Sequence, residues 1–494
     1  MSRSAISRRR FLEDSILATT ASMTAGAMTA AAATAAGRTV LADEPQSTSP
    51  NEKLSVAVIG VRGRGSSHVE AFSGRSDTEV TYICDADENP GRKRAKDAAS
   101  RQGREPKFVS DMREIFDDKS VDIISTATPN HWHALCSIWA MQAGKDVYVE
   151  KPVSHNVSEG RRMVEAARKY GRICQTGTQS RSNAGMIAAI EYLHSGKLGE
   201  IKLARALCYK LRPSIGPKGD YPVPASVNYD LWLGPAPTKS PPLTRRSLHY
   251  DWHWMWDYGN GDLGNQGIHQ MDIARWGLGV DNLGQSVLSY GGRLGYEDAG
   301  ETANTQVCIH DYGKQRLVFE VRGLQTPKLK GADVGNIFEG SDGYLVMTSY
   351  SGGVVFDPEG KTVTQFSGGG DHFGNFLNAV RSRKVEDLSA DILEGHLSSA
   401  LCHLGNISYR LGESIPLAEL KERLGDDAEA QETLARFTEH LAANKVKLES
   451  TRVHFGARLA INPESESFVG NAQADQMLTR EYRVPFVVPA AGEV

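Results

Sequence analysis

Apolar and polar positions in the first half of the chain alternate as they do where strands alternate with helices. Lys53 to Phe72 (KLSVAVIGVRGRGSSHVEAF) reads as an apolar strand, a glycine-rich turn and the start of a helix. Glu79 to Asp87 reads as a second strand ending in acid, and Val121 to Pro152 as strand, loop, helix, glycine turn and strand. This order predicts a parallel sheet with right-handed crossovers, in an α/β domain over residues 53–176.

The pattern changes in the second half. A helix is expected over Met186 to Ser195, followed by the strand EIKLARALCY. Short β patterns with glycine turns then run from Gln285 to Phe356, and helical patterns run from His372 to Arg410. Short strands in series favour a mainly antiparallel sheet, so residues 177–415 are expected to form an α+β second domain.

Two stretches fit neither pattern. The proline-rich stretch from Pro213 to Pro242 is too long for a plain loop. Residues 416–494 are expected to hold one charged helix, near Ala428 to Ala443, and an extended tail that ends in YRVPFVVP.

Composition narrows the class of protein. At 494 residues the chain is too long for one simple core, which agrees with two domains plus appendages. It is 40% hydrophobic and 23% charged, as soluble globular proteins are. The net charge of −4, with no basic block after the first residues, argues against a nucleic-acid partner. The six cysteines form no CxxC pair, so we expect no metal site and no disulfide framework.

The first 42 residues have the composition of a targeting segment. Ser7 to Asp14 (SRRRFLED) places paired arginines before an apolar Ala/Thr run from Ile16 to Ala36, and Val40-Leu41-Ala42 offers a cleavage point. This order is typical of twin-arginine export, so we expect a signal peptide over residues 1–42 and a periplasmic or otherwise exported protein. The alternative is a disordered basic tail. No other apolar run is long enough to span a bilayer.

A nucleotide site is predicted where the first strand meets its helix. Glycines there allow a tight turn and a close approach to a pyrophosphate at the helix N-terminus. Asp85 ends the second strand, where a carboxylate can bind ribose hydroxyls and repel a 2′-phosphate, so we expect NAD over NADP. The alternative is a plain βα turn. The loop residues expected to bind the cofactor are Gly60, Arg62, Gly63, Arg64 and Gly65, although Arg62 stands where the usual fingerprint has glycine.

A second candidate site follows the tryptophan-rich segment. In Gly259 to Trp276, the side chains Asn265, His269 and Asp272 fall at i, i+4 and i+7 and share one helix face. The face can serve acid/base chemistry, or it can belong to a helix with a buried histidine.

Two further motifs connect these sites. Thr128 to His133 (TPNHWH) follows a strand, and Ala143 to Pro152 (AGKDVYVEKP) follows the next helix. Together with the glycine loop, Asp85, Arg181 and the His269/Asp272 pair, they resemble the Gfo/Idh/MocA oxidoreductases in their order along residues 54–412. The leader, the tryptophan-rich segment and the tail resemble the exported bacterial branch of that family.

The resemblance implies a Rossmann-type domain joined to a substrate domain built on an antiparallel sheet. It implies that Lys151 binds the reacting hydroxyl and that His269 moves the proton. Family members act on sugars, cyclitols or their derivatives, and many are homo-oligomers that pair through the sheet. The further residues that it places at the cofactor are Thr128, Pro129, Asn130, His133 and Glu150.

The roles of several side chains stay open on the sequence alone. Arg181 is expected at the substrate, or else in an ion pair. We interpret Asp272 as orienting His269, and Asn265 as positioning substrate while leaving the pKa of His269 near its free value. The aromatic segment can form a sugar platform or belong to the core; its candidate substrate residues are Trp252, His253 and Trp254.

Three functions compete. The first is an NAD-dependent oxidoreductase that acts on a secondary hydroxyl of a sugar or sugar derivative. The second is a redox-neutral glycosidase or lyase, in which tightly bound NAD oxidises the sugar transiently, elimination follows and reduction restores the cofactor. Export favours this second possibility, because free NAD is scarce outside the cytoplasm. The third is a non-catalytic sugar-binding protein.

Overall fold

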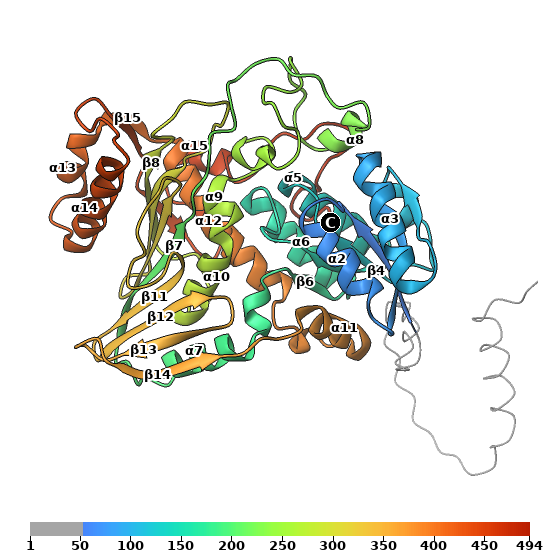
Figure 1. Ribbon diagram of the computed structural model, residues 1–494, viewed down its shortest axis with the longest axis horizontal. Coiled ribbons are helices and arrows are strands. Elements are labelled where there is room, and N and C mark those ends of the chain that lie inside the picture. The colour runs from blue at the N-terminus through green and yellow to red at the C-terminus, as the bar shows by residue number, and fades with distance from the viewer. Residues whose placement is uncertain (1–52) are drawn as a thin grey trace, which may run out of the picture. The chain divides into compact units, whose positions relative to one another are not determined.

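The computed structural model describes residues 53–494, and the signal peptide predicted for residues 1–42 lies outside that range. The first part of the described chain is a six-stranded parallel sheet in the order β3-β2-β1-β4-β5-β6, which confirms the predicted Rossmann-type domain (Figure 1). Its strands are β1 (Leu54–Ile59), β2 (Thr78–Cys84), β3 (Lys107–Val109), β4 (Ile123–Thr126), β5 (Asp146–Val149) and β6 (Cys174–Thr176). Its helices are α2 (Arg64–Ser73), α3 (Glu88–Gln102), α4 (Arg113–Phe116), α5 (Asn130–Gln142) and α6 (Val157–Lys169).

This parallel sheet is buried on both faces because its strands are apolar on both faces. Val58 and Ile83 pack toward α2, α3 and the distant helix α11 (His372–Ser382). Ile59 and Val147 pack toward α5 and α6. Each such fully buried side chain contributes about 1.5–3 kcal/mol relative to exposure. The sheet is therefore a rigid platform for the loops at its carboxyl edge.

The second sheet has twelve strands and is mainly antiparallel, as predicted; its central pair, β7 and β10, is parallel. Its path runs β14-β13-β12-β11-β7-β10-β9-β8-β16-β15, and β17 joins at β8 and pairs with β18. The strands are β7 (Ile201–Tyr209), β8 (Ser286–Gly292), β9 (Thr305–Asp311), β10 (Arg316–Arg322), β11 (Val334–Gly340), β12 (Gly343–Ser349), β13 (Gly352–Phe356), β14 (Thr362–Ser367), β15 (Glu413–Pro416), β16 (Arg452–Phe455), β17 (Leu459–Asn462) and β18 (Ser467–Phe468).

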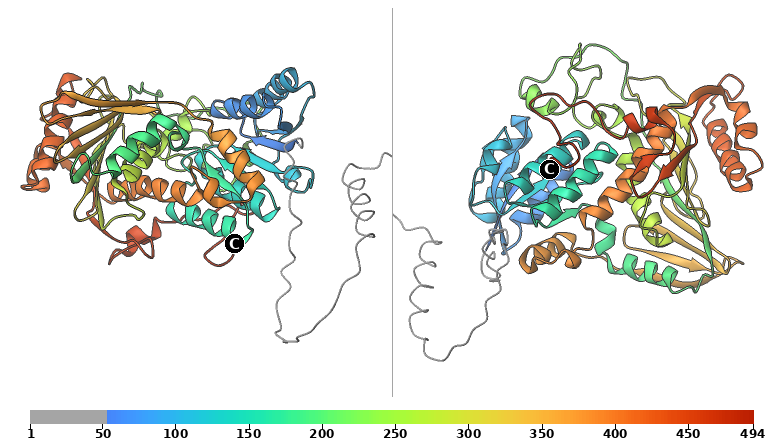
Figure 2. Two further views of the ribbon diagram at one scale, coloured as in Figure 1. Left: turned by 90° about the horizontal axis from the view of Figure 1, so that it is seen from below. Right: turned by 180° about the vertical axis from the view of Figure 1, so that it is seen from behind.

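Helices cover both faces of the large sheet. One face packs on α7, α10 and α12, and the other packs on α13 and α14. Helix α12 (orange) lies between the two sheets and contacts both α6 and β8 (Figure 2). The remaining helices are α7 (Ala184–His194), α8 (Tyr229–Leu233), α9 (Gly261–Asn265), α10 (Gly267–Leu278), α12 (Ile392–Arg410), α13 (Leu420–Leu424), α14 (Ala428–Ala443) and α15 (Ala472–Gln476).

The structure adds detail that the sequence pattern did not predict. The tail contributes β16, β17 and β18 as well as the expected α14, and Phe486 returns to pack edge-on against Trp132 of α5, 5.4 Å between ring centroids. The helix expected to carry Asn265 and His269 is divided at Gln266 into α9 and α10. No helix in residues 53–494 is long and apolar enough to cross a membrane.

Candidate functional site

The glycine-rich loop after β1 has the backbone geometry that a bound pyrophosphate requires. Gly60 and Gly63 have φ of +75° and +56°, in the region that favours glycine. A Cβ on Gly60 would lie 2.7 Å from the Thr128 nitrogen, and one on Gly65 would lie 1.8 Å from the Gly60 oxygen. Gly63 precedes α2 without a side-chain cap. The Gly65 and Ser66 nitrogens donate to the Arg62 and Gly63 oxygens (3.3 and 3.0 Å), which leaves the Arg64 N–H at the N-terminus of the helix for an anion.

Asp85 lies beside this loop, as predicted. Its carboxylate accepts hydrogen bonds from the Val61 nitrogen (2.8 Å) and the Asp87 nitrogen (2.9 Å). Burial raises the pKa of Asp85 to about 6, although both bonds favour the ionised form. Each oxygen keeps a lone pair, so the group can still accept from ribose hydroxyls.

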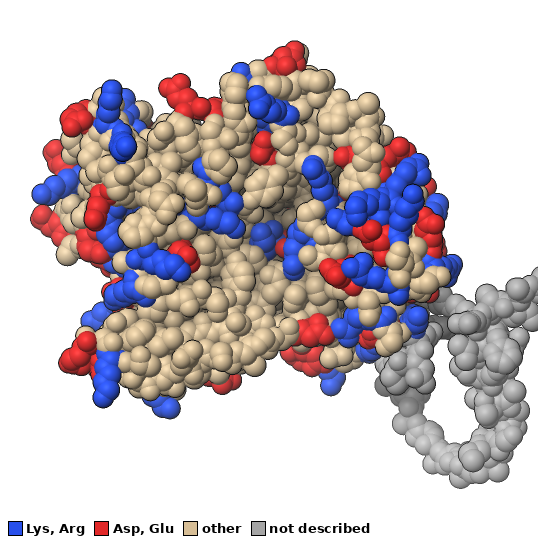
Figure 3. Space-filling view, viewed as in Figure 1, with Lys and Arg blue, Asp and Glu red and all other residues tan. Residues whose placement is uncertain are grey.

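A cavity of about 600 Å³ extends from this loop to the second half of the chain. It opens between α2 and α9, where Figure 3 shows lysine and arginine side chains around a central hollow. Its volume is that of a typical small-molecule site. The glycine cradle, the uncapped helix and the ribose-side carboxylate fit a dinucleotide. The predicted residues that line it are Gly60, Arg62, Gly63, Arg64, Asp85, Thr128, Pro129, Asn130, His133, Glu150, Lys151, Trp252, His253 and Asn265.

A buried charge cluster supports the end of β5. Glu150 Oε1 accepts from Arg64 Nε (2.8 Å) and lies 3.1 Å from His68 Nε2, while its Oε2 accepts from the Lys151 nitrogen (3.2 Å). Burial opposes ionisation of Glu150, but the His68 hydrogen bond and the Arg64 charge outweigh it and hold its pKa well below the usual range. Arg64 and Glu150 thus bind each other, and both also line the cavity in which the sequence placed them.

Lys151 and His269 come together from the two halves of the chain. Lys151 Nζ donates to the backbone oxygen of Asn265 at 3.0 Å, which joins the end of β5 to α9. Burial lowers the pKa of Lys151, against the charge of Glu150. Burial, with the Lys151 cation next, lowers the pKa of His269 to about 3, far below the nearly free value expected from Asn265. His269 is therefore a neutral imidazole at physiological pH.

Arg181 and Asp272 lie together but away from the cavity lining. Arg181 Nε donates to both Asp272 oxygens, at 2.9 and 3.1 Å, and both side chains are buried. Ser398 Oγ also donates to Asp272, at 2.7 Å. The ion pair proposed as the alternative for Arg181 is thus present. Asp272 bonds to Arg181 and Ser398, and no hydrogen bond joins it to His269 among the described residues.

The aromatic segment divides between the cavity and the core. Trp252 and His253 line the cavity and stack on each other, 3.6 Å between ring centroids. Trp254 is buried, with the Arg212 guanidinium 5.1 Å from its ring centroid, and is not among the lining residues. The first two positions can contact a substrate, and the third supports them.

The histidines of the TPNHWH motif fix loops. His133 places Nδ1 2.6 Å from the Pro152 oxygen and Nε2 2.8 Å from the Thr128 oxygen, so it ties the two motif loops together. His131 bonds instead to the Trp232 oxygen at 3.1 Å.

Sequence reasoning missed several residues of the site. The sequence analysis did not single out His68, because it lies within the helical pattern of α2. Its position one helical turn after Arg64 could have predicted that it lies near Arg64 on the same face of the helix. Tyr350, in the turn after β12, places its ring 5.0 Å from that of His269 and accepts a hydrogen bond from Gln266. No local motif marks Tyr350, because only the folded sheet brings it to α10.

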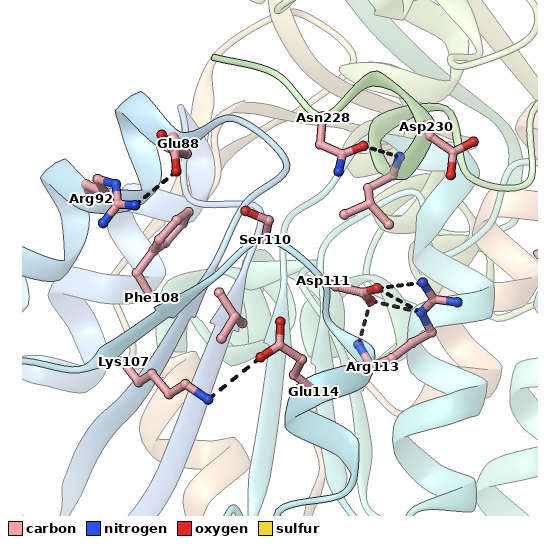
Figure 4. Close-up of a pocket in the computed structure, with 12 residues that line it drawn as sticks. Glu88, Arg92, Lys107, Phe108, Ser110, Asp111, Arg113, Glu114, Asn228 and Asp230 are labelled. Carbon is pink, nitrogen blue, oxygen red and sulfur yellow. Dashed lines mark hydrogen bonds and ion pairs between the residues drawn. The ribbon is translucent and has the colours of Figure 1, made fainter. Parts of the chain in front are cut away.

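A second hollow, of about 620 Å³, adjoins the ribose side of the cavity and shares Ser110, Asp111 and Leu231 with it (Figure 4). Its charged side chains pair with carboxylates: Arg92 with Glu88 (2.9 Å), Lys107 with Glu114 (3.7 Å) and Arg113 with Asp111 (2.5 Å). These pairs leave little free charge for a ligand.

The fold and the cavity are those of a two-domain, dinucleotide-binding protein. Residues 54–178 match the Gfo/Idh/MocA family model described as "Oxidoreductase family, NAD-binding Rossmann fold". Residues 217–439 match the companion model, "Oxidoreductase family, C-terminal alpha/beta domain". The chain belongs to the Gfo/Idh/MocA family of oxidoreductases, and its cofactor is NAD, as expected.

Individual relatives are more distant. Inositol 2-dehydrogenase of Salmonella paratyphi B is 28% identical over 149 residues, 30% of this chain and 43% of the relative. Alpha-N-acetylgalactosaminidase of Shewanella oneidensis is 27% identical over 154 residues, 30% and 34% of the two chains. Each match thus spans less than half of the relative. The WlbA dehydrogenase from Bordetella pertussis, solved with NADH and UDP-GlcNAcA, shares the fold: TM-score 0.54 at 21% identity, over 73% of this chain and 97% of that one.

Proposed function

We propose that the protein oxidises a secondary hydroxyl of a sugar, cyclitol or sugar derivative to the ketone, or reduces the ketone back to the hydroxyl. The contact of Lys151 Nζ with the Asn265 oxygen at the wall of the NAD cavity carries this proposal. His269 is buried and does not line the cavity, but it lies close enough to Lys151 for the ammonium charge to lower its pKa. The sugar class follows from the sugar-directed names of the relatives and from Trp252 at the cavity wall. Bound NAD supplies the hydride acceptor or donor for the carbinol carbon.

Lys151 binds the reacting oxygen. One ammonium proton is held by the Asn265 carbonyl at 3.0 Å, which leaves two for the substrate. Its charge stabilises the negative charge that develops on the substrate oxygen.

His269 moves the proton. Because burial lowers its pKa to about 3, His269 is neutral at working pH and a ring nitrogen carries a free lone pair. The same shift makes it a weak base, so it accepts the hydroxyl proton as hydride transfer from the carbinol carbon makes that proton acidic. The Asn265 side chain lines the cavity and positions substrate hydroxyls through its amide.

The test is spectroscopic. Purified protein is supplied with NAD and a panel of sugars, cyclitols and glycosides, and NADH absorbance is followed. Steady formation of NADH with one compound supports the proposal. Binding of a compound with neither NADH nor a released product would mean a non-catalytic sugar-binding protein and overturn it.

The redox-neutral glycosidase remains a second candidate, favoured by the similarity to an alpha-N-acetylgalactosaminidase. It predicts that NAD co-purifies with the protein and that a glycoside is cleaved without net NADH. Steady NADH accumulation from free sugar, with no cleavage of any glycoside, would refute it.

Export through the twin-arginine pathway is part of the proposal and rests on SRRRFLED at Ser7–Asp14. Replacing Arg8 and Arg9 by lysine is expected to keep the protein in the cytoplasm of fractionated cells. Undiminished delivery of the variant to the periplasm would contradict the assignment.

We also expect a homo-oligomer, from the pairing through the sheet that the family resemblance implies. Light scattering on the purified protein tests it, and a monomer mass at working concentration would contradict it.

A further inference from the structure

Two arginines near the reacting end of the NAD cavity, the end that Lys151 lines, already have carboxylate partners. Arg64 pairs with Glu150 at 2.8 Å. Arg212, which follows β7, donates to the two oxygens of Asp262 at 2.6 and 2.8 Å, and Asp262 is buried at the start of α9. Each pair is neutral as a whole, so neither supplies free positive charge to a substrate.

A further cation near this end, Lys210, has no such partner. It follows β7 directly and is exposed. Its Nζ donates to Gln266 Oε1 at 3.4 Å, and no carboxylate pairs with it among residues 53–494. Lys210 is outside the lining of the NAD cavity, so its contact with a bound molecule would be at the rim.

Gln266 holds Lys210 beside the reacting end. The Gln266 Nε2 donates to the Tyr350 hydroxyl, so its Oε1 is the atom left to accept from Lys210. Asn265, the preceding residue, lines the cavity, and its backbone oxygen accepts from Lys151 Nζ at 3.0 Å. The two ammonium groups are therefore bound to consecutive residues of the chain.

The charge of Lys210 also acts on both groups of the proposed reaction. Burial is the largest cause of the lowered pKa of Lys151 and of His269, and the Lys210 cation contributes to both shifts. Among the described residues, Lys151 and Lys210 donate only to neutral amide oxygens. Two cations without carboxylate partners at one end of a cavity attract an anion.

We infer that the substrate is a sugar that carries a carboxylate, such as a hexuronic acid, and that Lys210 binds this carboxylate. The inference rests on the proposed function and names the substrate class of the same site. Lys151 binds the reacting hydroxyl, and Lys210 keeps two ammonium protons for the carboxylate oxygens. One cation balances the single charge of a carboxylate, whereas a phosphate dianion needs a second one.

The experiment compares each acid with its neutral parent. D-glucuronate, D-galacturonate and D-mannuronate are titrated calorimetrically in parallel with D-glucose, D-galactose and D-mannose. The protein is saturated with NADH, which cannot accept hydride, so the titration measures binding alone. Lys210→Met removes the charge and keeps a long side chain. Lys202→Met is the matched control, because Lys202 is exposed on β7 and pairs with Glu200 at 3.5 Å.

The wild type and Lys202→Met should bind at least one acid about tenfold more tightly than its parent, as a charge-assisted hydrogen bond predicts, and Lys210→Met should lose this preference. NADH titration confirms that each variant is folded. Equal binding of every acid and its parent, or a preference that survives in Lys210→Met, would overturn the inference. Tighter binding of D-glucose 6-phosphate than of any acid would assign the site to a phosphate and overturn it as well.

A parallel assay separates this inference from the proposed function. The same compounds are supplied with NAD, and NADH absorbance is followed. NADH formed from a neutral sugar, with no tighter binding of any acid, would overturn the inference and leave the oxidoreductase in place. Binding of an acid that depends on Lys210, with no NADH from any compound, would support the carboxylate contact and count against the oxidoreductase.

Discussion

Removing the charge of Glu150 tests how the site is supported. Its Oε1 forms hydrogen bonds with Arg64 at 2.8 Å, His68 at 3.1 Å and Gln179 at 3.3 Å. Its Oε2 accepts a hydrogen bond from the Lys151 nitrogen at 3.2 Å. Glu150→Gln keeps the shape but leaves one acceptor oxygen and no charge. Breaking a buried ion pair costs about 3–5 kcal/mol. The Arg64 side chain is 41% exposed, so solvent partly compensates its charge when Glu150 is neutralised. We therefore expect Glu150→Gln to lower the free energy of unfolding by about 3 kcal/mol at most.

The pH dependence of this loss has a definite sign. The folded pKa of Glu150 is depressed, so its stabilisation is present above the unfolded pKa and is lost as pH falls through the folded pKa. The difference in free energy of unfolding between wild type and Glu150→Gln should be constant at neutral pH and shrink in acid. Because Glu150 raises the pKa of Lys151, the variant should also lose cationic Lys151 at lower pH.

Urea denaturation at a series of pH values measures the difference in free energy of unfolding. The dependence of kcat/KM on pH reports the protonation of Lys151. Glu70→Gln is the control, since Glu70 makes an exposed pair with Arg101 (2.8 Å) worth about 0–1 kcal/mol. A Glu150→Gln protein as stable as the control variant at every pH would refute the buried cluster as argued.

Two further predictions concern the cofactor and the proton carrier. Asp85→Ala should weaken NAD binding by about 1.5–3 kcal/mol, which is the usual contribution of hydrogen bonds to a charged group. In paired titrations with NAD and NADP, the variant should also discriminate less against NADP. A wild-type protein that prefers NADP would contradict the ribose contact. Asn265→Asp should raise the His269 limb of the pH–rate profile by about one to three pH units, because an adjacent carboxylate favours the imidazolium; an unmoved limb would separate this position from His269.

The sequence predicted what local patterning controls. The strand–glycine–helix pattern predicted a tight turn at Gly60, and there the chain lies too close to Thr128 for any side chain. The charged helical pattern predicted α14, which spans Ala428–Ala443. The pairing of Arg181 with Asp272 could not be predicted, because it joins residues 91 positions apart. The strands β16 to β18 contain two to four residues each, too few for a periodic signal. The lowered pKa of His269 could not be predicted, because it depends on how deeply the folded chain buries this side chain.

The central claim is that Lys151 and His269 act as one unit on the substrate oxygen, and a double-mutant cycle on the rate of NADH formation tests it most directly. Lys151→Ala, His269→Ala and the double variant are compared with wild type, with NAD affinity measured for each. The account predicts that both single variants retain NAD and lose most turnover, and that the double variant is about as slow as the slower single one, because groups that act together are non-additive. Near-full turnover in either single variant, or losses that multiply in the double variant, would contradict it.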